Sequence, residues 1–456
     1  MLRASTSEAA LVLAHPVAPL TLAEAGLSLD LVLQLALKTL YLSGDLIGTE
    51  LARRLGLRFP VIEPALDELR SARHIEVASG SMLGPSSYEY RILDAGRARA
   101  MLFLQQNQYV GVAPVPLAQY AAYLRAHQLA VPRTATRDRV REACRHLVLS
   151  DRVIDSLGPA VNAGHSLFVY GPPGNGKTVI AQSIRNLLDG DVAIPHAIAV
   201  EGQIIRIFDP VVHETIATPE SESLIVDGPD EDRRWVRCRR PLVTVGGELT
   251  LDALELSYLP VSGFYRAPLQ ALANGGVLVI DDFGRQRVGP RDLLNRWIVP
   301  LESRIDYLTL HTGKKFQVPF DVLTVFATNL DPAKLADEAF LRRIPYKIHV
   351  GDPSLEQFTS ILEMNCRRRD MTFHPVMAEY LHRRHYQPTD RPMRACHPRD
   401  LLDQVTALCR YRGEEPTLNR ENLDAACAAY FLDDDKAQTL PSQSSPRTNV
   451  PLIEVR

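Results

Sequence analysis

The stretch SLFVYGPPGNGKT, residues 166–178, constrains the fold of this chain more than any other part of its 456 residues. An apolar run enters a glycine-rich loop that matches G-x-x-x-x-G-K-[ST], and a helical pattern follows from Lys177 to Leu188. Glycines allow the unusual backbone angles with which successive amides surround a phosphate, and the N-terminus of the next helix points at the same anion. We therefore expect a phosphate-binding loop at the end of a strand in a parallel α/β sheet.

The side chains of this loop have separate expected tasks. Lys177 is expected to reach the β- and γ-phosphates of a nucleotide, and the Thr178 hydroxyl is expected to hold Mg²⁺. A glycine-rich turn without a ligand is the alternative, but the strand before the loop and the helix after it favour the phosphate site. The residues expected to bind the nucleotide here are Gly171, Pro172, Pro173, Gly174, Asn175, Gly176, Lys177, Thr178 and Val179.

A second motif, VLVIDDFG at 277–284, places two adjacent acids after a continuous apolar run. A run of that kind is typical of a strand in a sheet that is covered on both faces, and its end lies where open α/β sheets bind ligands. Taken alone, the two acids would more often mark a turn. Together with the glycine loop they predict a site in which Asp281 holds Mg²⁺ through coordinated water.

With these two motifs, the chain resembles the AAA+ ATPases from about residue 140 to 432. The segment DVLTVFATN, 321–329, resembles the strand that ends in the polar sensor of that family, which implies that Asn329 orients the attacking water. The resemblance implies a doubly wound parallel sheet of the P-loop NTPase class, a helical lid and a homo-oligomer, with a hexamer suggested. It also implies Mg²⁺ and ATP as ligands, and the absence of an N-K-x-D motif argues against guanine nucleotides.

Two further segments resemble parts of that family that carry arginines. DEAFLRRIPYKI, 337–348, is similar to the segment with the arginine finger, a guanidinium offered to the γ-phosphate of the neighbouring subunit. Arg343, next to the following apolar strand, is the preferred finger, and Arg342 is the alternative. HPRDLLDQ, 397–404, resembles the second sensor, which implies that Arg399 reaches the nucleotide from the lid.

Asp282 departs from the family pattern, in which the second acid is normally Glu and polarises the attacking water. The Asp side chain is one methylene shorter, so its carboxylate falls back by about 1.5 Å unless the backbone compensates. A misplacement on that scale can cost about a hundredfold in rate. Since the other catalytic residues are present, we expect slow but real hydrolysis with Asp282 as the second acid. A nucleotide switch that does not hydrolyse ATP is the alternative.

The remaining sequence divides around this core. Residues 25–107 show three helical patterns, two short strands and a further helix, an order that resembles a winged helix-turn-helix domain. The expected divisions are an N-terminal extension (1–24), the winged-helix-like domain (25–107), a linker (108–138), the ATPase core (139–351), a helical lid (352–432) and a disordered tail (433–456).

The core is longer than a minimal one, because it contains an insert at about 195–268. The insert has a β-rich stretch and resembles the MoxR-like and related branches, in which inserted hairpins project toward the pore of a ring. Its basic string, 233–241, is expected either to contact nucleic acid, a partner or the adjacent subunit, or to pair with the acids at 227–232. Phe264 and Tyr265 are expected to be core residues, with substrate gripping in the pore as the alternative.

Composition excludes several classes of protein. The net charge of −3 gives no general attraction to polyanions, so nucleic-acid binding would need a local patch. The six cysteines show no C-x-x-C pair and no zinc-ligand spacing, which predicts reduced thiols. The apolar stretch at 31–42 is too short to span a membrane, and the sequence before it is not shaped like an export signal. We therefore expect a cytoplasmic protein without membrane insertion.

The expected function is that of a ring-forming ATPase that remodels a protein partner docked through the N-terminal domain. A DNA-binding ATPase that uses the winged helix for regulation or loading is the alternative. The predicted recognition helix, 60–73, carries Glu63, Asp67 and Glu68 beside two arginines, whereas contacts to phosphate need basic side chains. Nucleic acid is therefore the less favoured partner.

Overall fold

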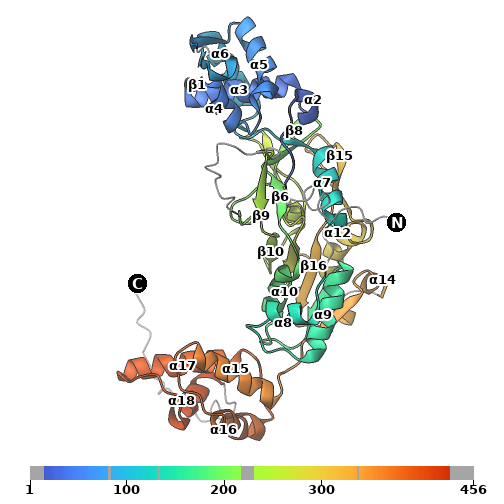
Figure 1. Ribbon diagram of the computed structural model, residues 1–456. Helices are drawn as coiled ribbons and strands as arrows, with labels where there is room; N and C mark the ends of the chain where they lie inside the picture. Colours follow the sequence, from blue (N-terminus) through green and yellow to red (C-terminus); the bar gives the residue numbers. More distant parts are fainter. Residues whose placement is uncertain (1–14, 81–83, 131–133, 217–230, 336–337, 432–456) are drawn as a thin grey trace, which may run out of the picture. The chain divides into compact units, whose positions relative to one another are not determined.

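The structure is a computed structural model that describes residues 15–80, 84–130, 134–216, 231–335 and 338–431. The chain forms two units, Met1–Gly351 and Asp352–Arg456 (Figure 1). Their boundary coincides with the predicted division between the core and the lid. Residues 1–14 of the predicted N-terminal extension and the predicted tail at 433–456 lie outside the described residues.

A parallel five-stranded sheet, with the strand order β10-β13-β16-β5-β17, forms the centre of the first unit (Figure 1). Its strands are β5 Leu167–Tyr170, β10 Leu242–Val245, β13 Val277–Ile280, β16 Leu323–Thr328 and β17 Tyr346–His349. Every residue of β13 and β16 is buried, because these continuous apolar runs form the middle of a sheet covered on both sides.

Helices cover both faces of this sheet. Leu167 and Val169 of β5 pack into the core on one face, whereas Phe168 between them packs into the core on the other. The covering helices are α8 Arg137–Ala143, α9 Asp151–Ala163 and α10 Lys177–Ser183 on the first face, and α12 Pro290–Ser303, α13 Pro332–Leu335 and α14 Glu338–Leu341 on the second. This arrangement confirms the predicted doubly wound α/β fold.

The insert adds β structure to which the preceding segments contribute β4 and β6, whereas β10, within the predicted bounds of the insert, belongs to the central sheet. A second sheet has the strand order β11-β12-β8-β7-β4, and β6 pairs with β9 in an antiparallel ladder. These strands are β4 Val115–Pro116, β6 Val192–Pro195, β7 Ala197–Val200, β8 Gln203–Arg206, β9 Trp235–Cys238, β11 Ser257–Leu259 and β12 Phe264–Arg266. A separate hairpin, β14 Ile305–Thr309 with β15 Lys315–Pro319, precedes β16. Its tip joins the second sheet, because Lys314 pairs with Glu201 and His311 stacks on Tyr258 with ring centroids 4.2 Å apart.

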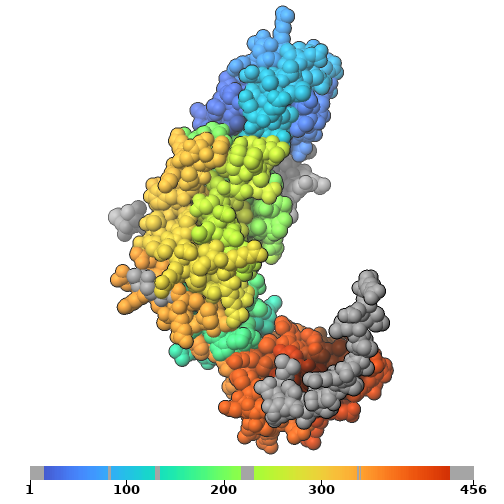
Figure 2. Space-filling model, turned by 180° about the vertical axis from the view of Figure 1, so that it is seen from behind, coloured from blue at the N-terminus to red at the C-terminus, as the bar shows by residue number. Residues whose placement is uncertain are grey.

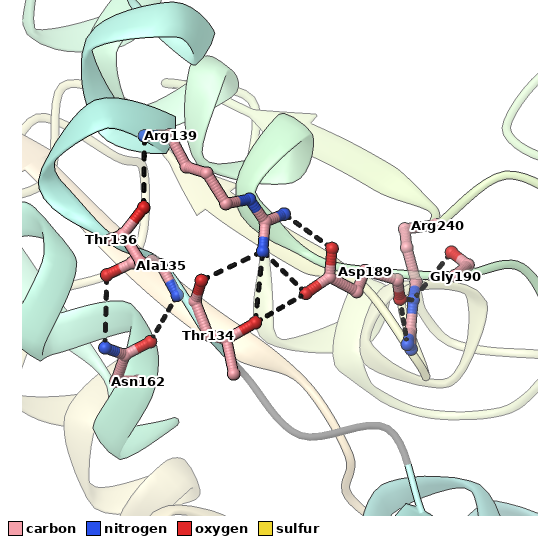
Figure 3. Close-up of polar contacts among 8 residues, drawn as sticks. All are labelled: Thr134, Ala135, Thr136, Arg139, Asn162, Asp189, Gly190 and Arg240. Carbon is pink, nitrogen blue, oxygen red and sulfur yellow. Dashed lines mark hydrogen bonds and ion pairs between the residues drawn. The ribbon is translucent and has the colours of Figure 1, made fainter. Parts of the chain in front are cut away.

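The segment 108–138, expected to be a linker, is more ordered than its prolines suggest. It contains β4 and the helix α7 Leu117–Ala130, whose Tyr120 and Leu124 are buried in one cluster with the insert. This burial supplies a reason for order that local sequence does not reveal. At the end of the segment, Arg139 pairs with Asp189 at 2.5 Å and fixes the start of α8 (Figure 3).

Residues 22–106, here called the N-terminal domain, contain the predicted helices and strands in the predicted order. The elements are α2 Leu22–Ala25, α3 Leu29–Ser43, β1 Leu46–Ile47, α4 Gly48–Arg54, α5 Phe59–Ser71, β2 Ile75–Ser79, β3 Glu89–Ile92 and α6 Asp94–Gln106. Its winged-helix character stays a prediction. The apolar core of this domain includes Ala197 and Ile204 of the insert, and Phe264 packs against it. Figure 2 shows the surface of the domain, in blue, directly beside the green and yellow part of the first unit. The domain and the insert therefore share one core.

The second unit is helical, as predicted. Its helices are α15 Leu355–Arg367, α16 Val376–Leu381, α17 His397–Arg412 and α18 Arg420–Tyr430, with a π-helical turn at His382–Tyr386. Ser354 and Gln357 form a reciprocal capping box that begins α15. None of the described helices, in either unit, combines the length and the apolar character that crossing a membrane requires. All six cysteines are free thiols, and five of them are buried.

Candidate active site

Three adjacent strand ends bring the sequence motifs together. The glycine loop follows β5, Asn329 follows β16, and the two acids Asp281 and Asp282 follow β13. These strands are neighbours with β16 in the middle, and parallel strands place their C-terminal ends at one edge of a sheet. Asn329 therefore lies between the glycine loop and the acids.

The shape of the glycine loop depends on close backbone contacts. Gly171 has a φ of +137°, and a Cβ atom added there would lie 2.2 Å from the carbonyl oxygen of Val350. Gly174 and Gly176 have φ values of +81° and +77°. The side-chain amide of Asn175 donates a 3.1 Å hydrogen bond to a backbone carbonyl just after β17. The loop thus takes a conformation that only glycine adopts readily at these positions.

Lys177 connects the loop to the second acid through Asn329. The Lys177 side chain is nearly buried, and its Nζ donates to the carbonyl oxygen of Pro172 at 2.8 Å and to Oδ1 of Asn329. The other end of the Asn329 amide donates to Oδ1 of Asp282 at 3.2 Å. The predicted phosphate ligand, sensor and second acid therefore form one hydrogen-bonded series.

A second contact joins the two predicted metal ligands. Oγ1 of Thr178 donates a 2.8 Å hydrogen bond to Oδ2 of Asp281. A hydroxyl and a carboxylate are oxygen ligands of the kind that Mg²⁺ prefers. Beside them, α10 begins with Gly176 at its N-cap, without a side-chain cap, at the end of the glycine loop. These residues fit a magnesium ion next to a bound phosphate.

The remaining predicted site residues lie outside this hydrogen-bonded set. Val179 is on the first turn of α10 with 38% of its side chain exposed. Arg343 pairs with Glu302 at 2.7 Å, whereas the neighbouring Arg342 is exposed. Arg399 belongs to the second unit, where it pairs with the adjacent Asp400. The roles of Val179 and the three arginines stay predictions.

Sequence reasoning missed two residues that hold the turn containing Asp282. The hydroxyl of Thr328 donates to the carbonyl oxygen of Phe283 at 2.7 Å, and the side-chain amide of Gln286 donates to that of Asp281 at 2.9 Å. No motif marks either residue, because each acts on backbone atoms and any sequence can supply those. Only the position of Thr328, directly before the predicted sensor, was a signal.

The basic string of the insert is engaged in local structure. Of the acids at 227–232, those before residue 231 lie outside the described residues, and Asp232 pairs with the string as expected. The other partners come from distant segments, and contact with nucleic acid, a partner or the adjacent subunit stays a prediction. The pairs are Arg234 with Asp232, Arg237 with Asp191 and Arg239 with Glu214 at 2.8, 2.8 and 3.2 Å, and Arg240 donates to the carbonyl oxygens of Asp189 and Gly275. The string forms β9 and its flanks, which places these side chains beside the loops around β6.

The aromatic pair before α11 Leu269–Leu272 belongs to the core, as preferred from the sequence. Tyr265 is 1% exposed, and its hydroxyl accepts a 3.0 Å hydrogen bond from the backbone amide of His311. The turn of the β11–β12 hairpin also lies against the N-terminal domain, since a Cβ atom on Gly263 would lie 2.3 Å from the carbonyl oxygen of Gln106. Tyr265 is therefore not available to grip a substrate in a pore.

Comparison with known families agrees with this architecture. Residues 150–201 match the family model described as magnesium chelatase, subunit ChlI, in a segment that runs from α9 through β5 and the glycine loop to β7. The core of the first unit is thus similar to an AAA+ ATPase domain over these residues. Residues 354–429, which span the four helices of the second unit, match a model described as a domain of unknown function (DUF8689). Among curated proteins, none matches this chain in sequence.

Solved structures similar to this chain are distant. The RuvB Holliday junction branch migration motor of Thermotoga maritima is 14% identical, with 63% of this chain and 71% of RuvB covered and a TM-score of 0.37. NtrX from Brucella abortus is 15% identical, with 71% of this chain and 65% of NtrX covered and a TM-score of 0.40. NtrX in complex with ATP is 14% identical, with 76% and 70% covered and a TM-score of 0.37. At these scores, neither protein assigns an activity to this chain.

Proposed function

We propose that this AAA+ protein hydrolyses ATP in a reaction that depends on Mg²⁺. One observation carries the proposal: Lys177, Thr178, Asp281, Asp282 and Asn329 gather at one sheet edge in two hydrogen-bonded sets. Binding of phosphate requires only the loop and its lysine. A second acid held next to a polar amide is what activation of a water molecule requires in addition.

Each member of the site has a role in this reaction. The ammonium of Lys177 and the loop amides bind the β- and γ-phosphates and stabilise charge on their oxygens. Thr178 and Asp281 hold Mg²⁺, which supplies further charge neutralisation at the phosphate oxygens. Asn329 orients the attacking water. Asp282 accepts a proton from that water as its oxygen bonds to the γ-phosphorus and the bond to ADP breaks.

The short side chain of Asp282 does not separate it from the rest of the site. Its carboxylate is one hydrogen bond of 3.2 Å from Asn329, which itself contacts Lys177. This proximity supports hydrolysis over the competing function, a nucleotide-gated switch without turnover. We propose slow hydrolysis that a partner can stimulate.

A ring of identical subunits, with a hexamer as the expected number, would complete the site. The neighbouring subunit would supply an arginine to the γ-phosphate. Arginine suits this role because its planar charged group stabilises the negative charge that develops on a phosphate. Arg343 must release Glu302 to act as the finger of a neighbouring subunit, whereas the exposed Arg342 is already without that constraint. We propose that one of these two serves the adjacent subunit and that Arg399 contacts nucleotide from the lid.

The proposed client is a protein docked on the N-terminal domain. The exposed surface of α5, the predicted recognition helix, carries Asp67 and Glu68, and Arg70 lies 3.8 Å from Asp67. Arg234, Arg237 and Arg239 of the basic string are engaged in ion pairs within the chain, which compete with contacts to DNA phosphates. These charges favour protein remodelling over DNA loading or regulation.

ATP turnover by the purified full-length chain tests the proposal. We expect phosphate release with Mg²⁺ATP that disappears in Lys177→Ala. A wild-type rate equal to that of Lys177→Ala would overturn hydrolysis, and retained binding of a fluorescent ATP analogue by the wild type would then identify the switch.

The client is tested by trapping. Asp282→Asn should bind ATP without turnover, so proteins that copurify with it from cells in ATP, but not with Lys177→Ala, are candidate clients. Salt-dependent binding of duplex DNA by the full-length chain would instead support the DNA-binding alternative.

A further inference from the structure

The backbone at Asp282 has a conformation that side chains rarely adopt. Asp282 has a φ of +49°, in the left-handed region, and Gly284 two residues later has a φ of +100°. L-residues avoid this region because the Cβ atom approaches a carbonyl oxygen, although Asp and Asn tolerate it better than most. The turn that carries the proposed second acid therefore needs support from its surroundings.

Gln286 closes this turn from one side. Its Nε2 donates to the carbonyl oxygen of Asp281 at 2.9 Å, and its Oε1 accepts from the backbone amide of Gly284 at 2.8 Å. One side-chain amide thus bonds the residue before Asp282 and the residue two after it. These two bonds fix the backbone on both sides of the acid.

Thr328 holds the same turn from the neighbouring strand. The side chain is buried, and its hydroxyl donates to the carbonyl oxygen of Phe283 at 2.7 Å while accepting from the amide of Leu330 at 3.1 Å. The amide of Phe283 also donates to the carbonyl oxygen of Ala327 at 2.8 Å. Because Thr328 directly precedes Asn329, it ties the turn of the acid to the residue expected to orient water.

We propose that Gln286 and Thr328 are positioning residues that hold the Asp282 carboxylate against Asn329. The inference rests on the proposed hydrolysis and explains how a shorter acid occupies the position of the usual Glu. The backbone, fixed in the left-handed region by these two side chains, keeps the carboxylate 3.2 Å from the Asn329 amide. Gln286 and Thr328 make hydrogen bonds to backbone atoms of the turn. Their loss therefore lowers the rate of ATP hydrolysis and leaves the affinity for nucleotide unchanged.

Thr328 offers a matched pair of substitutions. Thr328→Val keeps the shape and removes the hydroxyl, whereas Thr328→Ser keeps the hydroxyl. We expect Thr328→Val to lower kcat by roughly tenfold to a hundredfold, the scale for a misplaced catalytic group, with KM for ATP within about twofold of the wild type. Thr328→Ser should restore most of kcat. Equal kcat for the Val and Ser variants, or a fall in affinity in place of kcat, would overturn the role of Thr328.

Gln286 is tested with a neighbouring control. Gln286→Met removes both hydrogen bonds at similar length, and Arg287→Met makes the same replacement at an exposed position of the same segment. We expect a lower kcat and faster hydrogen exchange at the Gly284 amide for Gln286→Met only. A lower kcat with unchanged exchange at Gly284 would overturn positioning through the turn.

Loss of the proposed function and loss of the positioning role would give different results. A wild-type chain that releases no more phosphate than Lys177→Ala overturns the proposed function and, with it, this inference. A chain that hydrolyses ATP but tolerates both Thr328→Val and Gln286→Met overturns the inference alone.

Discussion

Thr178 and Asp281 are joined by a 2.8 Å hydrogen bond although 103 positions separate them along the chain. The contact exists because β5 and β13 flank β16 in the parallel sheet, so that the glycine loop and the acid reach the same edge. The fold alone therefore brings the Thr178 hydroxyl and the Asp281 carboxylate together in space. A Mg²⁺ ion that replaced the proton of this hydrogen bond would have both oxygen ligands close at hand.

Asp281→Asn is expected to weaken the effect of Mg²⁺ on nucleotide binding more than nucleotide binding itself. The amide keeps an acceptor for Thr178 but loses the charge that attracts a divalent cation. Calorimetric titration with ATP, with and without Mg²⁺, measures this difference. Asp252→Asn, at an exposed acid of the insert, is the control. An undiminished Mg²⁺ effect in Asp281→Asn would exclude this residue as the metal ligand.

The sequence could predict which residues meet at this edge of the sheet, because the order of the parallel strands determines where the residues after them lie. Once three buried strands are parallel neighbours, the residues that follow them must meet, whatever the loops between them do. Asn329 and Asp281 needed no further information. The glycine at position 171 likewise fits a loop that passes close to another backbone, since an added Cβ atom would meet the carbonyl oxygen of Val350.

Other parts depend on partners that are remote in the chain. The helix α7 is ordered because Tyr120 and Leu124 are buried against the insert. The prolines around α7 suggest a linker, so the local sequence gives no sign of this burial. The arginines of the basic string pair mostly with acids from other loops, so a charge run alone could not show their state. The left-handed backbone of Asp282 also has no signature in the sequence, because the residues that hold it bond to main-chain atoms.

Asp282→Glu is expected to lower ATP turnover, although Glu is the usual residue of the family. A left-handed backbone disfavours Glu more than Asp, and the fixed turn places the longer carboxylate too far forward. We expect a kcat loss of roughly tenfold or more and a lower melting temperature. Asp282→Asn provides the comparison, since it keeps the backbone preference while removing the base. A higher kcat for Asp282→Glu would show that the turn does not fix the acid.

Gly171→Ala is expected to abolish nucleotide binding. The new Cβ atom would lie 2.2 Å from the carbonyl oxygen of Val350 at a φ of +137°, so the loop must move away from β17. Gly313→Ala is the matched control, because its φ of +82° imposes backbone strain of about 1–2 kcal/mol without any atom within 4 Å. Affinity for a fluorescent ATP analogue should fall only in Gly171→Ala, while thermal melting should record destabilisation in both.

Arg234→Met is expected to destabilise the first unit strongly. The Arg234 side chain is 3% exposed, pairs with the equally buried Asp232 and donates to the carbonyl oxygen of Ala25 at 2.9 Å. Its removal leaves the buried carboxylate without its ion-pair partner and with the backbone amide of residue 234 as a donor, and breaking a buried pair in this way costs about 3–5 kcal/mol. Arg233→Met, at an exposed neighbour, should change little. Thermal melting compares the two, and similar melting temperatures for both variants would contradict a structural role for the buried pair.

The second unit is expected to lose stability in acid through His397. Nδ1 of His397 is close to the Tyr386 hydroxyl at 3.0 Å and accepts from the Arg394 amide at 3.3 Å, so the neutral ring fits its site. Burial lowers the pKa of His397 from 6.5 to about 4, with Arg394 acting in the same direction and Asp400 opposing it.

Because the folded pKa lies below the unfolded one, the unfolded chain binds the proton first. The stabilisation is complete above about pH 6.5 and is lost as pH falls toward 4. Melting of the full-length chain between pH 7.5 and 4.5 should therefore show a shallower decline of the second unit's transition in His397→Gln than in the wild type. His374→Gln, at an exposed histidine of the same unit, should keep the wild-type slope. Parallel slopes for His397→Gln and the wild type would mean that this ring does not couple protonation to folding.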